Sequence, residues 1–346
     1  MTKNNRSLRL PAEWEPQSAV LVAWPHERTD WAPILDDARK CMTDIINAVS
    51  RRADVLVAAP LDLCLDDIRS RGFDFTKVYL YDVPTDDTWA RDFGPVTVID
   101  GGRLKCLDFM FNGWGLKFAS ANDNLITMRL AGRHNALPGE RVNRLSFVLE
   151  GGSIESDGEG TILTTSECLL SPNRNGGMTQ GEIEEYLKEQ FGADRVLWLD
   201  HGALAGDDTD SHIDTLARFA SPDTIVYCGA GQPGNPNHDG LVRMRDQLME
   251  FRRADGLPYH LVELPLPDPI FDEEGEQLPA TYANFLVCNG AVFVPVYGQK
   301  LNDELAVMTL KAVFHEHEIV PVDCRALIRQ HGSLHCVTMQ LPRSAE

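Results

Sequence analysis

Short strand-like runs alternate with amphipathic helical stretches from one end of this 346-residue chain to the other. The runs are apolar and β-rich, too brief for average helices, and cover residues 19–24, 55–59, 77–81, 96–99, 146–149, 161–164, 195–199, 224–228, 260–264, 285–288, 291–296 and 318–322. The helical stretches cover 34–52, 62–71, 179–191, 239–253 and 303–315. Because no Pro/Gly/Ser-rich linker interrupts this order, we predict one α/β domain over residues 1–346.

The end of the first predicted strand argues against a common class of α/β protein. Dinucleotide-binding domains place a glycine-rich phosphate loop directly after their first strand. Here the run 19–24 continues into Pro25, His26 and Glu27, without a glycine. A Rossmann domain is therefore not expected.

The net charge limits the partners of the protein. A formal charge of −20 repels nucleic acid and anionic membranes, and weakly favours a small cationic substrate. The apolar stretch 285–296 is interrupted by Asn289 and Gly290 and is too short to span a bilayer. Residues 1–9 are polar and basic with no apolar run behind them, so we expect no secretory signal and a cytoplasmic location. Many cytoplasmic proteins are acidic for solubility alone.

Eight cysteines are spread singly along the chain, with no C-x-x-C pair. In a reducing compartment most of them should be buried free thiols. Four polar segments follow apolar runs, where α/β scaffolds present functional side chains: residues 88–95, 149–152, 206–214 and 332–336. Together they supply several carboxylates, the imidazole of His212 and the thiol of Cys336.

These groups suit hydrolysis of a guanidinium. That ion is planar and charged, and its paired N–H donors match carboxylates, which Asp92, Asp214 and Glu150 can provide. Its carbon needs a strong nucleophile, such as the thiolate of Cys336 with a nearby cation to lower its pKa. His212 can serve in turn as general acid and general base.

Each residue also has a simpler interpretation. Cys336 can be a buried small hydrophobe, His212 a paired surface histidine and Asp92 the partner of Arg91. Trp89 and Trp114 can be core or rim aromatics, and the carboxylate of Glu150 can cap loop amides.

A different enzyme class is also compatible with the acidic segment 206–214. Asp207, Asp208, Asp210 and His212 resemble a carboxylate metal cluster, which would indicate a metal-dependent hydrolase. Two further alternatives are amidine transfer to an amine and a non-catalytic polyamine-binding protein.

Eight segments in chain order resemble those of one enzyme family: residues 10–16, 89–95, 111–115, 149–154, 163–170, 206–214, 282–285 and 335–338. At these residues the sequence resembles the agmatine deiminase and bacterial peptidylarginine deiminase family. The resemblance implies a pentein fold, a five-bladed α/β propeller of ββαβ-like units around a pseudo-fivefold axis, with the active site in its central channel. It also implies conversion of agmatine to N-carbamoylputrescine and ammonia, in polyamine biosynthesis, without a cofactor or metal.

The resemblance also assigns roles to residues. Cys336 falls on the nucleophile that forms a thiouronium intermediate, and His212 on the general acid/base. Asp92 and Asp214 fall on the two acids that grip the guanidinium. Substrate-binding or supporting positions are matched by Glu150, Trp89, Trp114 and Asn284. The expected partner is a small cationic guanidino compound, and the sequence leaves open whether the protein is a homo-oligomer.

Two departures from the family pattern lie where the tail of the substrate should sit. Residues 331–335 replace a glycine-rich turn before the nucleophile, and Leu116 replaces a glycine of the tryptophan loop. The tail is therefore open between agmatine, free arginine and peptidyl arginine. An α-carboxylate would need a cation, and Arg174 is a candidate outside the matched positions.

Overall fold

The computed structural model describes residues 7–344. Residues 1–6, on which much of the expectation of no secretory signal rests, lie outside this range. Within residues 7–344, no helix combines the length and the apolar character needed to cross a membrane.

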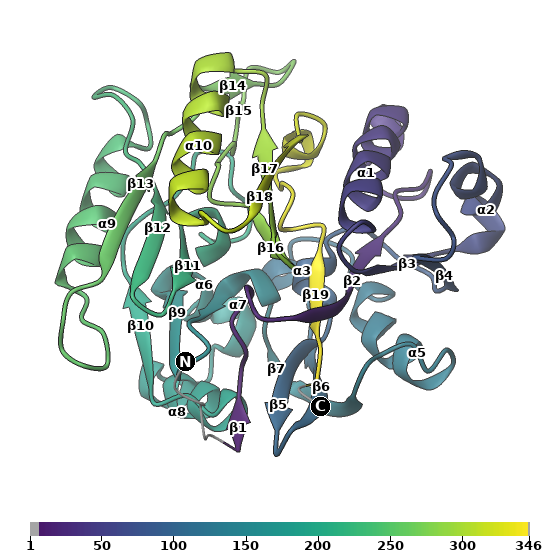
Figure 1. Cartoon of the computed structure of the whole chain (residues 1–346), viewed down its shortest axis with the longest axis horizontal. Helices are drawn as coiled ribbons and strands as arrows, with labels where there is room; N and C mark the ends of the chain where they lie inside the picture. The colour runs from purple at the N-terminus through teal and green to yellow at the C-terminus, as the bar shows by residue number, and fades with distance from the viewer. Residues whose placement is uncertain (1–6, 345–346) are drawn as a thin grey trace.

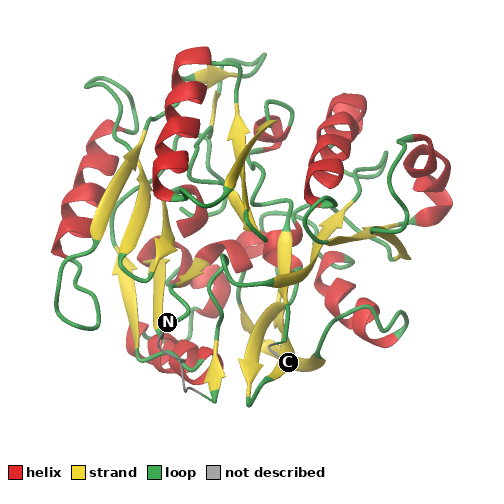
Figure 2. Ribbon diagram, viewed as in Figure 1, coloured by secondary structure: helices red, strands yellow, loops and turns green. Residues whose placement is uncertain are grey.

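The strands form five sheets of three or four strands, and each sheet contains the same unit (Figures 1 and 2). In this unit the first strand runs antiparallel to the second, and the second runs parallel to the third after a crossover that contains a helix. Parallel neighbours need a long crossover connection from one end of the sheet to the other, which explains why helices lie between the parallel strands. Five ββαβ units therefore account for almost all of the regular structure.

The strands and long helices of the units are as follows. The first unit has β19 (Met339–Pro342), β2 (Gln17–Ala23), α1 (Leu35–Val49), β3 (Asp54–Ala59), α2 (Leu61–Ser70) and β4 (Val78–Asp82). The second has β5 (Val96–Asp100), β6 (Arg103–Met110), α5 (Ile126–Gly132) and β7 (Glu140–Val148), with β1 (Leu8–Arg9) beside β5. The third has β8 (Ile154–Ser156), β9 (Thr161–Thr165), α8 (Gln180–Phe191) and β10 (Arg195–Leu199). The fourth has β11 (Ala217–Ser221), β12 (Thr224–Cys228), α9 (His238–Glu250) and β13 (His260–Leu264), and the fifth has β16 (Leu286–Cys288), β17 (Ala291–Val296), α10 (Lys300–Val313) and β18 (Glu318–Asp323). A separate ribbon pairs β14 (Ile270–Phe271) with β15 (Gln277–Leu278).

The first unit is assembled from both ends of the chain. Strand β19 pairs antiparallel with β2, so that Met339 lies opposite Leu21. The loop that carries Cys336 immediately precedes β19, and this pairing therefore fixes its position. In the described residues no pairing joins the five sheets into one closed sheet.

Every predicted strand and helix overlaps an observed one, but several elements were missed. Strand β6 contains Arg103, Lys105 and Asp108, and β11 contains Arg218, so neither reads as an apolar run. Strand β19 is short and ends in Pro342. These strands exist because they pair with neighbours, which is a tertiary cause that periodicity cannot show.

Apolar side chains from the helices and the sheets build the core. One cluster joins residues of α1, α9 and α10 to the sheets beneath them, and a second lies between β5–β7 and α8. Local signals fix where α8 begins and ends: Thr179 and Glu182 form a capping box, and Gly192 takes a left-handed conformation after the last turn. The amphipathic helices thus cover the sheets as their periodicity predicts.

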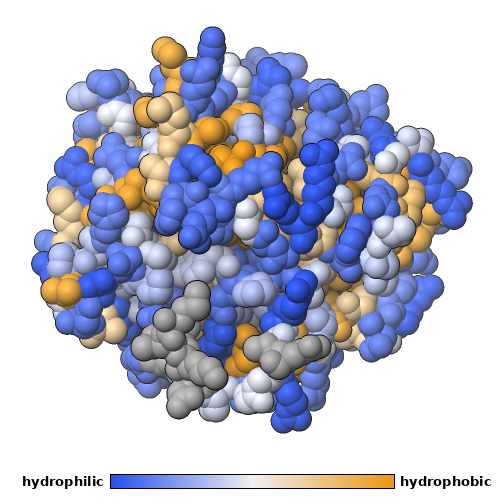
Figure 3. All heavy atoms as spheres, viewed as in Figure 1, coloured by the Kyte–Doolittle hydropathy of each residue, from blue (hydrophilic) through white to orange (hydrophobic). Residues whose placement is uncertain are grey.

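Hydrophilic residues dominate the face seen in Figure 3, as expected from the composition. Hydrophobic residues gather over α10, where Leu301, Leu305 and Met308 are exposed.

Short helical turns bring the polar segments together. Helix α3 (Ala90–Phe93) contacts the turn Gly151–Ser153, and that turn contacts the turn Ile213–Thr215. These three turns carry or adjoin Asp92, Glu150 and Asp214. Helices α4 (Gly113–Leu116), α6 (Ser166–Leu169) and α7 (Pro172–Asn175) and the turns Ala32–Ile34, Asp123–Leu125 and Leu327–Gln330 complete the regular structure.

Candidate active site

Cys336 lies in a buried loop that Asn284 holds in place. The Oδ1 atom of Asn284 accepts hydrogen bonds from the backbone N–H groups of His335 (2.9 Å) and Cys336 (3.3 Å). The same oxygen lies 3.4 Å from the Cys336 Sγ atom. Asn284, predicted to contact or support the substrate, therefore supports the thiol-bearing loop.

The charges nearest to the thiol are negative. Asp214 Oδ2 lies 4.0 Å from Cys336 Sγ. Burial, together with Asp214 and Asp92, raises the pKa of the Cys336 thiol well above its ordinary value. The expectation that a nearby cation lowers this pKa is therefore wrong for the protein without its substrate, because carboxylates stand where that cation was expected. A positive charge bound between these carboxylates would lower the pKa of the thiol again.

Asp92, at the first turn of α3, is one of these carboxylates. Its Oδ2 atom accepts a hydrogen bond from the indole Nε1–H of Trp114 (2.9 Å), and its Oδ1 atom accepts one from the backbone N–H of Gly152 (3.0 Å). Burial raises the pKa of Asp92 to about 6, although His212 opposes this shift. Asp92 is thus an acid with neutral donors and no arginine or lysine partner.

His212 lies beside Asp92, with 3.6 Å between His212 Nδ1 and Asp92 Oδ1. Neither ring nitrogen has a hydrogen-bond partner within residues 7–344, although the ring is buried. Burial lowers the pKa of His212, but Asp92, Cys168 and Glu150 together outweigh it, so that the pKa lies well above the ordinary value. The imidazole is therefore held as a cation and has protons to give.

Gly152 creates the space between these groups. A Cβ atom at this residue would lie 2.7 Å from His212 Nδ1, 2.8 Å from Asp92 Oδ1 and 3.1 Å from Asp214 Oδ2. Any side chain here would displace the three groups. Gly152, the second glycine after Glu150, is thus required because three functional side chains approach its Cα atom closely.

Asp214 offers an acceptor that nothing in the described chain uses. Its Oδ2 atom accepts a hydrogen bond from His335 Nδ1 (2.7 Å), whereas its Oδ1 atom is buried and has no partner among residues 7–344. Burial tends to raise the pKa of Asp214, but the hydrogen bond and charge of His335 dominate and lower it. An ionised, buried, unpaired oxygen indicates a missing donor.

Cys336 and Asp92 open onto a cavity of about 150 Å³. Its other lining residues are Asp30, Asp87, Trp89, Trp114, Phe118, Asp208, Thr209, Gln330, His331 and Gly332, so that the lining contains four aspartates and neither arginine nor lysine. Trp89 and Trp114 thus line the same cavity as Cys336, and their role as substrate-binding residues stays a prediction. Gly332 permits this packing, since a Cβ atom there would lie 2.2 Å from the ring of Trp89. The cavity suits an elongated cation with an apolar middle.

Unusual backbone conformations gather around this cavity. Trp114 (φ 54°), Asp210 (φ 66°), Ser211 (φ 61°) and His331 (φ 66°) lie in the left-handed region. Leu116, the departure from a family glycine, has φ 70° and is exposed. Strain of this kind persists where the surrounding structure fixes a functional geometry.

Glu150 and Arg174 form a buried pair behind His212. Both carboxylate oxygens of Glu150 accept from Arg174 Nε, at 2.9 and 3.0 Å. The rest of the guanidinium donates to Asp210 Oδ2 (2.5 Å) and to the backbone oxygen of Thr209 (2.9 Å). Glu150 is not among the residues that line the cavity, and its role as a substrate contact stays a prediction. All three guanidinium nitrogens of Arg174 donate to oxygens of the protein, so Arg174 does not offer a pair of free donors to an α-carboxylate.

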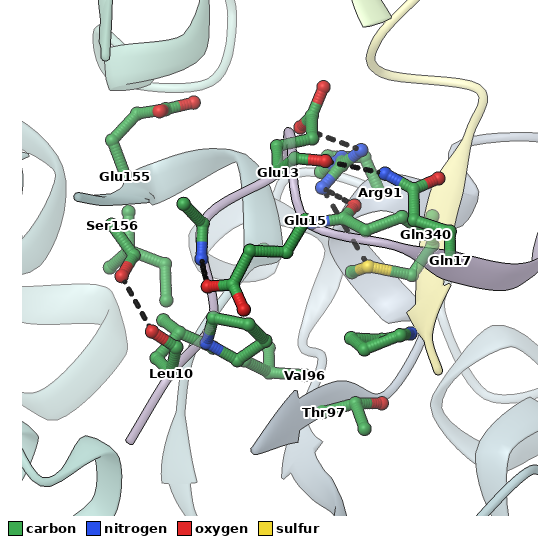
Figure 4. A pocket seen from close by; sticks show the side chains of 16 residues that line it. Leu10, Glu13, Glu15, Gln17, Arg91, Val96, Thr97, Glu155, Ser156 and Gln340 are labelled. Atoms are coloured by element: carbon green, nitrogen blue, oxygen red, sulfur yellow. Dashed lines mark hydrogen bonds and ion pairs between the residues drawn. The ribbon is translucent and has the colours of Figure 1, made fainter. Parts of the chain in front are cut away.

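A second set of buried charges lies next to Asp214, which it meets through the ring of His335. We call it the arginine network: Glu13, Glu155, Arg91, Arg218 and His335. Arg218 forms ion pairs with Glu13 (3.0 Å) and Glu155 and donates to the backbone oxygens of Ala283 and Phe285. Figure 4 shows Glu13, Glu155 and Arg91 beside a second cavity, with Arg91 close to Glu13 and Gln340.

Sequence reasoning missed the arginine network. Glu13 and His335 lie in segments that carry the family resemblance, but their spacing indicates no chemistry. Arg218 lies in a strand that reads as neither apolar nor functional. Its side chain is only 1% exposed, and this burial, which only the structure shows, identifies Arg218 as a member of a buried charge network.

Two groups of side chains have metal-ligand geometry in the described residues: Glu150, Cys168 and His212, and Glu13, Glu155 and His335. Arg174 and Arg218 already supply positive charge to these carboxylates, so neither group needs a cation. The predicted metal cluster does not assemble. Asp207 accepts from Thr209 and Ser211, Asp210 pairs with Lys117 and Arg174, and Asp208 lines the cavity. The expectation of buried free thiols is confirmed for all the cysteines.

Comparison with known proteins places this site in context. The family model of the Porphyromonas-type peptidyl-arginine deiminases matches residues 9–342. The agmatine deiminase of Stutzerimonas stutzeri is 32% identical over 96% of this chain and 95% of its own. A crystal structure from Porphyromonas gingivalis, provisionally named an arginine deiminase, is 47% identical, covers 97% of this chain and 99% of its own, and has a TM-score of 0.88. The C. jejuni agmatine deiminase with substrate bound is 37% identical, covers 100% and 99%, and has a TM-score of 0.90.

Proposed function

The chain belongs to the Porphyromonas-type peptidyl-arginine deiminase family, and we propose that it hydrolyses the guanidinium group of agmatine through a covalent intermediate on Cys336. The resemblance read from the sequence is thereby confirmed. The observation that carries the proposal is the cavity around Cys336, whose lining has four aspartates and no arginine or lysine. Relatives named agmatine deiminases, one of them with substrate bound, support the same reaction.

The unpaired atoms of the site match the donors of a guanidinium. Asp214 Oδ1 lacks a partner, and Asp92 lacks a cationic partner other than His212. A guanidinium held between these carboxylates would complete both, and its carbon would face Cys336 Sγ. The same positive charge would lower the pKa of the thiol, which burial and the carboxylates raise. Binding of the substrate would thus itself activate the nucleophile.

The reaction then proceeds in two steps. As the substrate's charge lowers its pKa, the Cys336 thiol gives its proton to solvent. The thiolate then attacks the guanidinium carbon and a C–S bond forms, and the C–N bond breaks as the protonated His212 gives a proton to the departing ammonia. Water attacks the thiouronium carbon, neutral His212 accepts one of its protons and solvent the other, and the C–S bond breaks to leave a ureido product and the thiolate. The overall reaction consumes one water and releases one ammonia. The groups involved are those of this chain alone.

The tail of the substrate is proposed from the charges at the mouth of the cavity. Asp30, Asp87 and Asp208 can face the ammonium of agmatine. The α-carboxylate of free arginine would meet no free arginine, since Arg174 is engaged. The one basic lining residue, His331, already uses Nδ1 toward the backbone oxygen of Gly206 (2.7 Å) and lies near Asp208. An unpaired buried carboxylate costs about 3 kcal/mol, or roughly a hundredfold in kcat/KM.

The architecture is also part of the proposal. We propose that the five ββαβ units surround a pseudo-fivefold axis as a pentein-type five-bladed propeller, and that residues 1–346 form one domain. The repeated strand order supports this, as does a family model that runs without interruption from residue 9 to residue 342. A cytoplasmic location stays a prediction, and whether the protein is a homo-oligomer stays open.

Peptidyl arginine is the second candidate substrate, because the family model and a 47% identical structure carry arginine or peptidyl-arginine names. The test is a measurement of ammonia release by the purified protein with agmatine, free arginine and a blocked arginine peptide. We expect kcat/KM for agmatine to exceed that for free arginine by about a hundredfold. A preference for the peptide, or equal values for arginine, would reject agmatine and keep the thiol mechanism. No ammonia from any of them would reject the reaction.

A further inference from the structure

His335, the residue before Cys336, has one carboxylate at each ring nitrogen. Its Nδ1 atom lies 2.7 Å from Asp214 Oδ2, and its Nε2 atom lies 2.7 Å from Glu13 Oε2. All three side chains are buried. The ring therefore connects the end of the chain that carries the nucleophile to a segment more than three hundred residues earlier.

Glu13 is itself held rigidly. Its Oε1 atom accepts a hydrogen bond from the backbone N–H of Val287 (2.7 Å), and its Oε2 atom accepts one from Arg218 Nη2 (3.0 Å). Arg218 is fixed in turn by Glu155 and two backbone oxygens. Glu13 thus gives His335 an anchor that does not move with the substrate.

The consequence for Asp214 is that its two oxygens differ in their partners. His335 occupies Oδ2, which leaves the buried Oδ1 atom without a hydrogen-bond partner among residues 7–344. We propose that Glu13 and His335 are positioning residues of the deimination, which fix Asp214 through the His335 ring so that one oxygen faces the guanidinium. This inference rests on the proposed function. The backbone N–H of His335 also binds Asn284 Oδ1, so one residue aligns both the nucleophile loop and the acid. Displacement of the carboxylate that binds the guanidinium by about 1 Å lowers the rate on the order of a hundredfold.

Two substitutions of His335 separate the two hydrogen bonds. The side-chain nitrogen of His335→Asn can take the place of Nδ1 and donate to Asp214, whereas that of His335→Gln takes the place of Nε2 and reaches Glu13 only. We expect His335→Asn to keep kcat/KM for agmatine within about tenfold of the wild type and His335→Gln to lose about a hundredfold. A merely structural role of the ring would not distinguish the two amides at equal thermal stability.

Glu13→Gln tests the hydrogen bond at Nε2 of His335 without a change in the size of the side chain. An amide cannot accept hydrogen bonds at both ends, so either Val287 or the His335–Arg218 pair loses its acceptor. We expect at least about a tenfold loss of kcat. The agmatine Kd, measured in a Cys336→Ser background, separates lost binding from lost chemistry. Asp108→Asn is the matched control. Asp108 lies on β6, is buried and pairs with Arg141 of β7, and it is not among the residues of the site. It should lower Tm and leave kcat unchanged.

The outcomes are distinct. An active wild type with His335→Asn and His335→Gln within threefold of each other, or with Glu13→Gln within twofold of the wild type, overturns the positioning role and keeps the proposed function. A wild type that releases no ammonia overturns both. If the His335 variants do not fold, the Glu13→Gln result decides.

Discussion

The Cys336 cavity and the arginine network lie side by side and both contain several carboxylates, yet they differ in their counterions. Asp30, Asp87, Asp92 and Asp208 line the cavity without an arginine or lysine among them. In the arginine network Glu13 and Glu155 both pair with Arg218. A buried acid with an internal cation holds the fold together, whereas Asp92, the fully buried acid of the cavity, has no arginine or lysine partner in the described chain and can take a cation from outside. The difference between the two regions therefore indicates which of them binds substrate.

Proton affinities show the same contrast. Burial raises the pKa of Asp92 to about 6, because His212 only partly offsets it. For Glu13 burial acts in the same direction, but His335 and Arg218 overcome it and lower the pKa. Asp214 touches both regions, and its pKa is lowered through His335. Of the two acids proposed to bind the guanidinium, Asp214 therefore stays ionised to lower pH, whereas Asp92 takes up a proton as the pH falls through about 6.

The largest effect is expected at the nucleophile. Cys336→Ser should lower kcat by at least about a thousandfold, because an alcohol ionises far less readily than a thiol. Agmatine binding, measured by calorimetry, should stay nearly unchanged. Mass spectrometry should detect a trapped adduct on Cys336 and on none of the other buried cysteines. Full activity in Cys336→Ala would reject the mechanism.

In the arginine network the expected loss is in stability. Arg218→Met removes the cation shared by Glu13 and Glu155 and leaves two buried acids without it. The free energy of unfolding should fall by about 3 to 5 kcal/mol, as is usual when one partner of a buried pair is removed. Urea unfolding measures this change. A loss below about 1 kcal/mol would show that the network does not hold the fold together.

Asp92→Asn is the matching change in the cavity. It keeps the size and the acceptor for Trp114, but it loses the acceptor for the backbone N–H of Gly152 and removes the charge that is proposed to bind the guanidinium. We expect kcat/KM to fall about a hundredfold and the free energy of unfolding to fall by about 1 to 2 kcal/mol, less than in Arg218→Met. Initial rates and urea unfolding of one preparation measure both. Equal damage to stability here and in Arg218→Met would erase the contrast between the regions.

The pH dependence should reflect Asp92. Because its pKa is raised to about 6, its carboxylate form is present above that pH and is lost as the pH falls through it. The kcat/KM for agmatine, which reports the free enzyme, should therefore fall about tenfold per unit below pH 6. Circular dichroism over the same range would show that the fold persists. Rates that stay level down to about pH 5 would contradict this assignment.

The smallest effect is expected from metal removal. Guanidinium and metal ion would compete for the same carboxylates, so EDTA should leave the rate of ammonia release unchanged. The control is a known zinc hydrolase treated in parallel. Loss of activity that a divalent metal restores would return the segment 206–214 to a metal-site interpretation.

The elements and much of the site could be predicted from the sequence. Strands and helices with strong periodicity were all found, because their burial pattern is local. Cys336, His212, Asp92 and Asp214 were identified as one group through segments that resemble a family, and the structure brings them together. Strand β19 and the arginine network were not predicted, since a strand at the far end of the chain and a charge inside the core leave no periodic signal.

The amino-acid sequence by itself therefore determined the chemistry that is available: a thiol, an imidazole and paired carboxylates on an α/β scaffold. Tertiary structure decided how each group behaves. Cys336 and Asp92 acquire raised pKa values from burial beside other acids, and Asp214 acquires a lowered one from His335. Burial and the distance to a counterion set these energies, and both arise only when segments as distant as Glu13 and His335 meet in the folded chain.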